Sequence, residues 1–280
     1  MKTGLVLEGG AMKGMHTSGV LDVFLDNDIS FDGAIGVSAG ALFGVNFVSK
    51  QRGRAIRYNS KYCADKHYMG LYSFLTTGNV VNTEFAYYTV PQKLDIFDDE
   101  TYRKGIPFYI VVTNVETGQA EYPRLYSVLS EMEILRASGA MPFLSKPIKL
   151  GENYYLDGGV ADSIPFEKFR EMGYEKLVVV LTKDKDYVKG PMPKKLVEAF
   201  YSKEYPEFAK ALINRHEMYN EQTRKLKELE KSGDAFVIRP SKPLTLSRIE
   251  KDPKKLWEAY ELGFADGKAA LPGLLDFLGK

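Results

Sequence analysis

Short apolar segments and helix-like segments alternate through the first fifty residues, and this alternation constrains the fold more than any other feature of the sequence. Residues 3–8 form an apolar run of strand length, followed by a glycine-rich loop at 9–14. Residues 15–27 carry apolar side chains at helical spacing, residues 31–37 form a second apolar run, and residues 39–50 again fit a helix. Such alternation is typical of a parallel sheet covered by helices, so the opening predicts an α/β fold.

The alternation continues over most of the chain. The later segments expected to be regular are strands at 106–115, 119–122, 176–182 and 235–239, a hairpin at 146–156, helices at 127–138, 164–172 and 204–231, and a C-terminal helix through Trp257 and Tyr260. Residues 183–195 are charged and contain proline, which indicates a surface loop. We expect one domain over residues 1–240, with residues 241–280 as a helical extension packed on it.

Charge and composition exclude several classes of protein. The 38 Lys and Arg residues nearly balance the 37 Asp and Glu residues, so the formal net charge is +1 and nothing indicates a nucleic-acid partner. A single cysteine, Cys63, excludes an intrachain disulfide and fits a reducing compartment. The apolar start of the chain ends at Glu8, too early for a signal peptide, and no apolar run is long enough for a membrane span. We therefore expect a cytoplasmic protein that contacts membranes only from their surface.

A serine turn follows the second expected strand. Gly36-Val37-Ser38-Ala39-Gly40 matches the G-x-S-x-G pattern of a nucleophile elbow, in which the serine hydroxyl projects above the sheet and small neighbours such as Gly36 and Gly40 prevent clashes. The amide after the serine and the N-terminus of the following helix can stabilise a negatively charged oxygen. An ordinary glycine turn would have the same residues, but the apolar strand before it and the helix-forming run after it favour Ser38 as a nucleophile.

The loop Glu8-Gly9-Gly10-Ala11-Met12-Lys13-Gly14 connects the first expected strand to the first helix and is suited to bind an anion through backbone amides. A phosphate-binding P-loop would end in Gly-Lys-Ser/Thr, whereas Met15 follows Gly14. A dinucleotide fingerprint would need glycine where Ala11 stands and an acidic residue at the end of the second strand. Because the first two strands would be neighbours, this loop and Ser38 would lie at one sheet edge. We interpret the loop as an oxyanion hole, with a purely structural helix-opening loop as the alternative.

A serine nucleophile needs a base, and the sequence offers histidines and one well-placed aspartate. His16 lies beside the glycine loop, His67 lies in a tyrosine-rich segment, and His216 lies on a charged helix. The order Ser38, Asp157, His216 would suit the triad of an α/β-hydrolase. In that fold, however, the elbow follows several strands, and the histidine lies on a loop at the active edge. We expect His216 on the surface of its helix, and His16 facing solvent or capping local structure.

Asp157 is the better candidate for the base. It ends the expected strand Tyr154-Tyr155-Leu156, at the kind of strand terminus where open sheets place ligands. A carboxylate with a pKa of about 3.9 is a weak base in water, but burial beside Ser38 would raise that pKa. Gly158 and Gly159 allow a close approach. Asp157-Gly158 alone would indicate a hairpin turn, but together with the serine turn it predicts a Ser38–Asp157 dyad.

These motifs, in this order, resemble those of the patatin-like phospholipase family, most closely its bacterial single-domain members. The match comprises the glycine loop, the serine turn, Asp157-Gly158-Gly159 and Ala137-Ser138-Gly139-Ala140-Met141-Pro142, and it spans residues 3–182. The resemblance implies a three-layer α/β/α sandwich with a mostly parallel central sheet. It implies hydrolysis of lipid or phospholipid acyl esters without a catalytic histidine, a metal or another cofactor. The roles it implies are Ser38 as nucleophile, Asp157 as proton acceptor, and Gly9, Gly10, Ala11, Met12, Lys13 and Gly14 as the oxyanion hole.

One residue departs from that family's pattern. The third position of the loop is usually glycine, and here it is Ala11, whose side chain disfavours a positive φ. Lys13 agrees with the Arg or Lys that is usual there. Two other functions remain as alternatives, namely a Ser–His–Asp esterase that uses His216 or His16, and a catalytically silent module that binds lipid or a partner. The aromatic segments at 68–74 and 85–88 would line an acyl channel or pack within the core.

Overall fold

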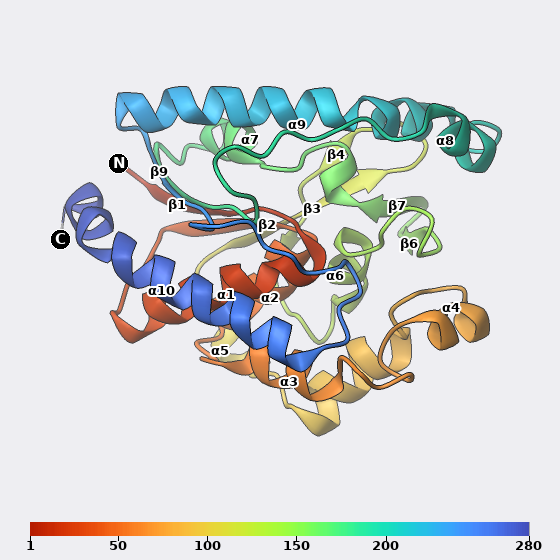
Figure 1. Cartoon of the computed structure of the whole chain (residues 1–280), viewed down its shortest axis with the longest axis horizontal. Coiled ribbons are helices and arrows are strands. Elements are labelled where there is room, and N and C mark those ends of the chain that lie inside the picture. The colour runs from red at the N-terminus through yellow and green to blue at the C-terminus, as the bar shows by residue number, and fades with distance from the viewer. Residues whose placement is uncertain (280) are drawn as a thin grey trace.

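The computed structural model describes residues 1–279 and is built around one nine-stranded sheet (Figure 1). The strand order is β6-β7-β3-β2-β1-β8-β9, and two short strands, β4 and β5, also pair with β3. The strands span Thr3–Leu7 (β1), Gly33–Val37 (β2), Phe108–Asn114 (β3), Ala120–Glu121 (β4), Arg124–Leu125 (β5), Ile148–Leu150 (β6), Asn153–Asp157 (β7), Lys176–Val180 (β8) and Ala235–Ile238 (β9). The five strands β3-β2-β1-β8-β9 are parallel, and the remaining pairings are antiparallel. The sheet is therefore mostly parallel, as predicted.

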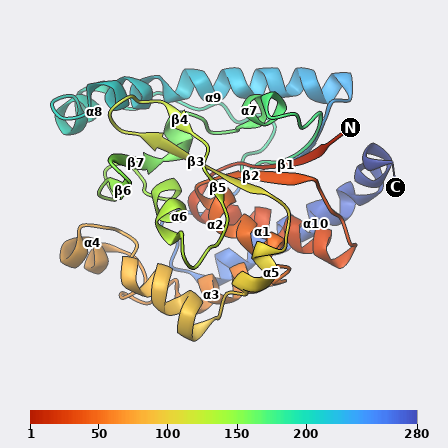
Figure 2. The ribbon, with the colours of Figure 1, turned by 180° about the vertical axis from the view of Figure 1, so that it is seen from behind.

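Helices cover both faces of the sheet, so the molecule has three layers (Figures 1 and 2). Helices α7 and α9 lie over one face, and α1, α2 and α10 lie over the other. The helices span Gly14–Asp26 (α1), Ala39–Val48 (α2), Arg54–Tyr62 (α3), Leu71–Thr77 (α4), Asp99–Arg103 (α5), Met132–Ser138 (α6), Phe166–Glu171 (α7), Lys194–Tyr201 (α8), Pro206–Ser232 (α9) and Pro253–Leu278 (α10), with 3₁₀ helices at Ala11–Lys13 (η1) and Gly158–Val160 (η3) and a π-helix at Glu84–Leu94 (η2). The predicted α/β/α architecture is confirmed.

The apolar strands of the sequence are explained by this layering. Parallel strands with both faces covered carry apolar side chains on both sides, and residues 177–180 of β8 are fully buried. In β1, Leu7 packs with Phe24 in the core beneath α1 and α2, whereas Val6 packs with Phe166 in the core beneath α7 and α9. Neighbouring residues of one strand thus pack into the two cores on opposite faces of the sheet.

Strand register brings three chain segments to one edge of the sheet. Leu7 of β1 pairs with Gly36 of β2, and Val112 of β3 pairs with Asp157 at the end of β7. The glycine loop after β1, Ser38 after β2 and the carboxylate that ends β7 therefore emerge close together.

The C-terminal helix α10 packs along α1 on the face opposite α9 (Figure 1). Across this contact the Nε2 atom of His16 lies 2.9 Å from a carboxylate oxygen of Asp266, and the Tyr260 hydroxyl donates to Asp22 at 2.7 Å. His16 is 0% exposed because α10 covers it, so the expectation that it faces solvent is wrong. The division of the chain near residue 240 stays a prediction.

One expected helix is shorter than its sequence pattern suggested. Helix α6 begins at Met132, not at Ser127. The amides of Val128 and Leu129 donate to the carboxylate of Asp99, at 2.7 and 3.2 Å, instead of entering a helix. A side chain from a distant segment has replaced the local hydrogen bonds that the pattern implied.

Candidate active site

Ser38 occupies a strained turn between β2 and α2. Its backbone has φ +51° and ψ −120°, a region that residues other than glycine rarely adopt and that costs about 1–3 kcal/mol. Glycine is required nearby, because a Cβ atom on Gly40 would lie 2.4 Å from the carbonyl oxygen of Leu7. The turn thus has the geometry expected of a nucleophile elbow.

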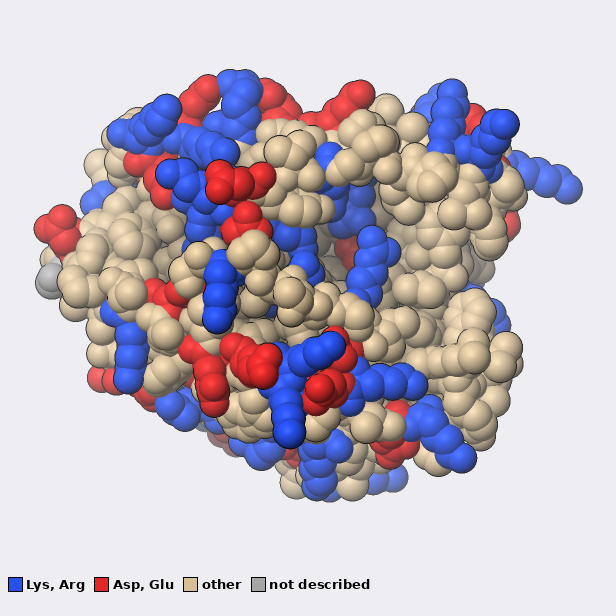
Figure 3. All heavy atoms as spheres, in the orientation of Figure 1, with Lys and Arg blue, Asp and Glu red and all other residues tan. Residues whose placement is uncertain are grey.

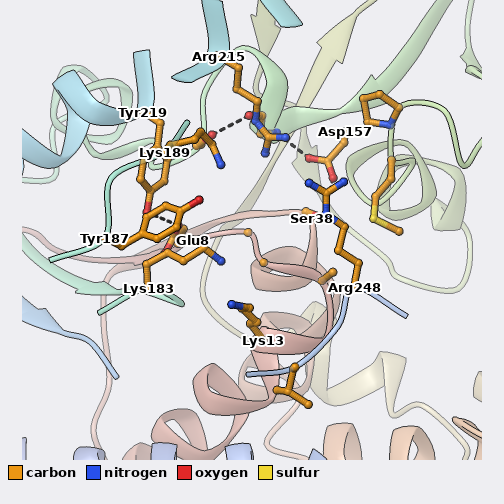
Figure 4. Close-up of a pocket in the computed structure, with 18 of the residues that line it drawn as sticks. Glu8, Lys13, Ser38, Asp157, Lys183, Tyr187, Lys189, Arg215, Tyr219 and Arg248 are labelled. Atoms are coloured by element: carbon orange, nitrogen blue, oxygen red, sulfur yellow. Dashed lines mark hydrogen bonds between the residues drawn. The ribbon is translucent and has the colours of Figure 1, made fainter. Parts of the chain in front are cut away.

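The hydroxyl of Ser38 donates a hydrogen bond to Oδ2 of Asp157 at 2.8 Å (Figure 4). The amide of Gly159 donates to the other carboxylate oxygen, also at 2.8 Å. Gly158 must stay small, because an added Cβ atom would lie 2.1 Å from the carbonyl oxygen of Val111. Ser38 is 7% exposed and Asp157 is 5% exposed, so the pair is nearly removed from water.

Burial raises the pKa of Asp157 above its ordinary value. The positive charge of Arg215, the hydrogen bond from Ser38, the amide of Gly159 and the charge of Arg248 act in the opposite direction. Because burial is the largest influence, this carboxylate holds a proton more strongly than an exposed aspartate does. It is a better proton acceptor for that reason.

Ser138 holds the serine turn against the sheet. Its hydroxyl accepts a hydrogen bond from the amide of Ser38 at 2.8 Å and donates to the carbonyl of Val111 at 2.7 Å. The carbonyl of Ala140 accepts from the amide of Asp157 at 2.9 Å. The segment at 137–142 therefore fixes both members of the pair, a role that its sequence pattern alone did not specify.

The glycine loop forms one wall of the cavity that contains Ser38. Of the six residues expected in an oxyanion hole, four line this cavity, namely Gly9, Gly10, Ala11 and Lys13. Met12 lines a neighbouring apolar cavity, and an added Cβ on Gly14 would lie 2.7 Å from the ring of Phe43. The first amides of the 3₁₀ helix η1 have no acceptor within that helix, so they are available to a bound anion.

Ala11 adopts the left-handed backbone conformation, with φ +49°. Alanine pays a steric penalty of about 1–2 kcal/mol there, whereas glycine does not. We expect Ala11→Gly to stabilise the protein by about 0.5–1 kcal/mol, since the greater chain entropy of glycine offsets part of the gain. The shift in the denaturant midpoint measures this effect.

Ala41→Gly is the matched control for that substitution. Ala41 lies inside α2, where glycine is destabilising by about 1 kcal/mol, so the two variants should shift the midpoint in opposite directions. A loss of stability in both would contradict the left-handed conformation of Ala11.

The cavity in front of Ser38 has a volume of about 250 Å³ and is mainly polar. Sequence reasoning identified its glycine loop, Ser38 and Asp157. It missed the charged and aromatic residues of the other walls, which are Lys183, Tyr187, Lys189, Arg215, Tyr219 and Arg248. The loop at 183–195, expected on the surface, thus contributes to the site.

A second, apolar cavity of about 110 Å³ adjoins the glycine loop. Met12 lines it from the loop, and Leu42 lines it from α2, where the Leu42 amide donates to the carbonyl of Ser38 at 2.9 Å. Tyr68 and Tyr87, from the two aromatic segments identified in the sequence, contribute to its walls. The mainly apolar walls of this cavity suit a hydrocarbon chain.

The three histidines do not join the Ser38–Asp157 pair. His16 is bonded to α10, the His67 ring lies 3.1 Å from the carboxylate of Asp65, and the Nδ1 atom of His216 lies 3.0 Å from a carbonyl of its own helix. Within residues 1–279, no group of three or more His, Cys, Asp and Glu side chains is arranged to hold a metal ion.

Comparisons with known proteins identify several that this chain resembles. Residues 5–170 match the family model for patatin-like phospholipase, and residues 205–279 match a domain of unknown function, DUF6363. The chain is 27% identical over 273 residues to the uncharacterized protein YjjU of Escherichia coli K12, covering 94% of this chain and 75% of that protein. It is 24% identical over 180 residues to the probable lipid hydrolase 463L of Invertebrate iridescent virus 6, covering 58% of this chain and 61% of that protein. Among solved structures, VipD from Legionella pneumophila aligns with a TM-score of 0.49 and 14% identity, over 97% of this chain and 67% of that chain.

Proposed function

Because the chain belongs to the patatin-like phospholipase family, which implies a lipid hydrolase, we propose that it is a serine acyl-ester hydrolase with Ser38 as nucleophile and Asp157 as base. One observation carries this proposal. The Ser38 hydroxyl donates to the buried Asp157 carboxylate at 2.8 Å, within a cavity that Gly10 and Ala11 of the glycine loop line. A nucleophile, a base and oxyanion donors are thus within reach of one bound ester.

The reaction proceeds through an acyl-enzyme. The Oγ atom of Ser38 bonds to the ester carbonyl carbon while its proton passes to Asp157, and the amides of the glycine loop stabilise the oxyanion that forms. When the oxyanion collapses, the bond to the alcohol breaks, and the alcohol leaves with the proton from Asp157. Water then attacks the acyl-enzyme, gives its proton to Asp157, and releases the fatty acid as the proton returns to Ser38.

The apolar cavity beside the glycine loop is the proposed site of the acyl chain. Its position next to Met12 and Leu42 would place the hydrocarbon on one side of the oxyanion amides and the alcohol in the polar cavity on the other. Burial of each methylene group in such a space contributes about 0.8 kcal/mol to binding. The acyl chain is therefore the part of the substrate that the apolar walls would recognise.

Two competing functions have less support. A Ser–His–Asp triad would need an imidazole in the cavity, and no histidine among residues 1–279 lines it. A purely lipid-binding module would have no use for the strained backbone of Ser38 or for a base bonded to its hydroxyl. Both features are useful to a nucleophile.

A fluorophosphonate probe tests the proposed function. We expect it to label Ser38 in the folded protein, with the site assigned by peptide mass spectrometry, and to label Ser38→Ala at background level. Ser130→Ala, which removes an exposed serine on the loop before α6, should be labelled like the wild type. Lack of labelling in folded wild type would favour the silent module, and loss of ester turnover in His16→Ala or His216→Ala would favour the triad.

Contact with a membrane surface stays a prediction, as do the cytoplasmic location and the absence of a nucleic-acid partner. Within residues 1–279, none of the helices is both long enough and apolar enough to span a bilayer. The apolar side chains of Leu71 and Leu75 on α4 are 68% and 74% exposed, which makes α4 the proposed contact with lipid. Co-sedimentation with lipid vesicles should weaken in a Leu71→Ser, Leu75→Ser variant.

A further inference from the structure

Basic side chains from four separate segments converge on the cavity that contains Ser38. They come from the glycine loop, the loop after β8, helix α9 and the segment between β9 and α10. They are Lys13, Lys183, Lys189, Arg215 and Arg248. Figure 4 shows their side chains around one open space beside Ser38, and Figure 3 shows Lys and Arg gathered about a hollow in this face of the molecule.

Among the described residues, none of these five cations is held in a salt bridge, although the charges of Asp157 and Glu8 act on Arg215 from a greater distance. In the described part of the chain none of them forms an ion pair within 4.0 Å, and the Nε atom of Arg215 is buried without a hydrogen-bond acceptor. The two carboxylates of the cavity are already engaged. Glu8 accepts hydrogen bonds from Tyr219 and Thr182, and Asp157 accepts from the serine hydroxyl. The cavity lining therefore carries five positive charges against two negative ones, and of the five cations Lys183 and Lys189 also lie over tyrosine rings.

The buried cation Arg54, elsewhere in the protein, has a carboxylate partner. Arg54 lies 3.3 Å from the Asp95 carboxylate, and it also donates to the backbone carbonyl of that residue. In the cavity, by contrast, burial followed by repulsion from Arg215 and Lys183 lowers the pKa of Lys189 to about 8. Four of the five cations are half-buried and Arg248 is exposed, so their charges repel one another around a cavity that is open to a ligand. An anion bound among them would relieve this repulsion, so their convergence indicates a binding site.

The two arginines lie outside the part of the chain that matches the lipase family. The match to patatin-like phospholipases ends at residue 170, whereas Arg215 and Arg248 lie within residues 205–279, which match a domain of unknown function. Arg215 lies beside the residues that follow Asp157, because its Nη2 atom lies 2.9 Å from the position that a Cβ on Gly159 would occupy. The C-terminal segment thus completes a wall of the cavity that the lipase segment leaves open.

We propose that residues 205–279 supply a subsite for a phosphate monoester, so that the substrates are acyl esters of phosphorylated polyols such as acylglycerol phosphates. The inference rests on the proposed hydrolase function and specifies its substrate class. A phosphate monoester carries a charge of about −1.5 to −2 and three acceptor oxygens, which suit several converging cations. Arginine can bind such a group through two parallel hydrogen bonds. A choline or ethanolamine head group would instead bring a positive charge into a positive cavity.

Hydrolysis of three esters with the same acyl chain tests the head-group assignment. The esters are a monoacylglycerol phosphate, a monoacylglycerol and a monoacylglycerophosphocholine. We expect wild-type kcat/KM to favour the phosphate ester over each of the others by at least about tenfold. Arg248→Gln and Arg215→Gln should each reduce this ratio by about tenfold to a hundredfold, the range for hydrogen bonds to charged groups. A ratio near one in the wild type, or an unchanged ratio in the double variant, would overturn the assignment.

Lys185→Gln is the matched control for these variants. Lys185 lies on the same loop as Lys183 and Lys189, but it is exposed and does not line the cavity. We expect its substrate ratio to equal that of the wild type. Arg248 is exposed, so Arg248→Gln should not disturb folding. This variant can therefore test the subsite even if a substitution at the less exposed Arg215 impairs folding. A loss of preference in Lys185→Gln as large as in Arg248→Gln would count against a defined subsite.

Calorimetry on Ser38→Ala separates the subsite from catalysis. We expect glycerol 3-phosphate to bind more tightly than inorganic phosphate, and the added double substitution Arg215→Gln, Arg248→Gln to weaken it at least about tenfold. Equal affinity for inorganic phosphate would identify a free-phosphate site and overturn the head-group assignment. If the arginines govern binding but wild type hydrolyses none of the three esters, the hydrolase proposal fails while the subsite stands. If esters are hydrolysed but glycerol 3-phosphate does not bind, only the subsite fails.

Discussion

Asp157→Asn is expected to lower kcat/KM for acyl esters by about 10²–10⁴, and Ser38→Ala by at least about a thousandfold. Asparagine has nearly the size of aspartate, but its amide cannot take the proton that leaves the Ser38 hydroxyl. Alanine removes the hydroxyl that is the proposed nucleophile. Turnover of a p-nitrophenyl acyl ester, with active-site concentration fixed by titration, measures both effects.

The pH dependence of the same reaction gives an independent check on Asp157. Only the ionised carboxylate accepts a proton, so kcat/KM should fall as acidification takes the pH through the pKa of Asp157. Burial raises that pKa from its ordinary 3.8, and the acid limb should therefore lie above the pH expected for an exposed aspartate. The residual activity of Asp157→Asn should lack this limb.

Asp162→Asn is the matched control, because Asp162 is another buried aspartate with a raised pKa, about 6. Its carboxylate accepts from Gln222 and Tyr122 and does not line the Ser38 cavity. This variant should keep most of its turnover and the acid limb of the wild type. An acid limb that persists in Asp157→Asn and disappears in Asp162→Asn would exclude Asp157 as the base.

The serine and aspartate could be found in the sequence because their signals are local. A glycine-flanked serine between an apolar run and a helix, and an aspartate before two glycines at a strand end, each determine their own backbone conformation. Parallel pairing of β1 with β2 and the register of β3 with β7 then bring Ser38 and Asp157 together. The three-layer architecture follows from the same alternation of strands and helices.

The basic residues of the cavity wall could not be predicted from local sequence signals, because their position depends on tertiary packing. Arg215 lies in a helix whose many charges indicate solvent exposure. The sequence pattern does not predict that the side of α9 that carries Arg215 faces the sheet. Tyr219, one turn later, is buried against the sheet and fixes that orientation. His16 was assigned wrongly for a related reason, since the helix that covers it comes from the far end of the chain.

Gly263→Ala is expected to destabilise the protein by about 1–3 kcal/mol or more, although alanine is normally the better helix residue. Helices α1 and α10 approach so closely that a Cβ atom on Gly263 would lie 1.9 Å from the backbone oxygen of His16. The reciprocal position, Gly19, would place a Cβ atom 2.1 Å from the backbone oxygen of Tyr260. Backbone atoms cannot rotate away as side chains do, so α10 must move outward and the hydrogen bond between Tyr260 and Asp22 must lengthen.

Gly273→Ala on the same helix separates this crowding from the effect of helix propensity. A Cβ atom there would approach only the side chain of Phe236, at 3.2 Å, and that ring can adjust. Gly273→Ala should therefore change the denaturant midpoint little, whereas Gly263→Ala should lower it clearly. Because α10 follows the segment that carries Arg248, the Gly263→Ala variant should also lose part of any preference for phosphorylated esters at temperatures where it remains folded. Equal midpoints for Gly263→Ala and Gly273→Ala would show that the two helices do not pack backbone to backbone in solution.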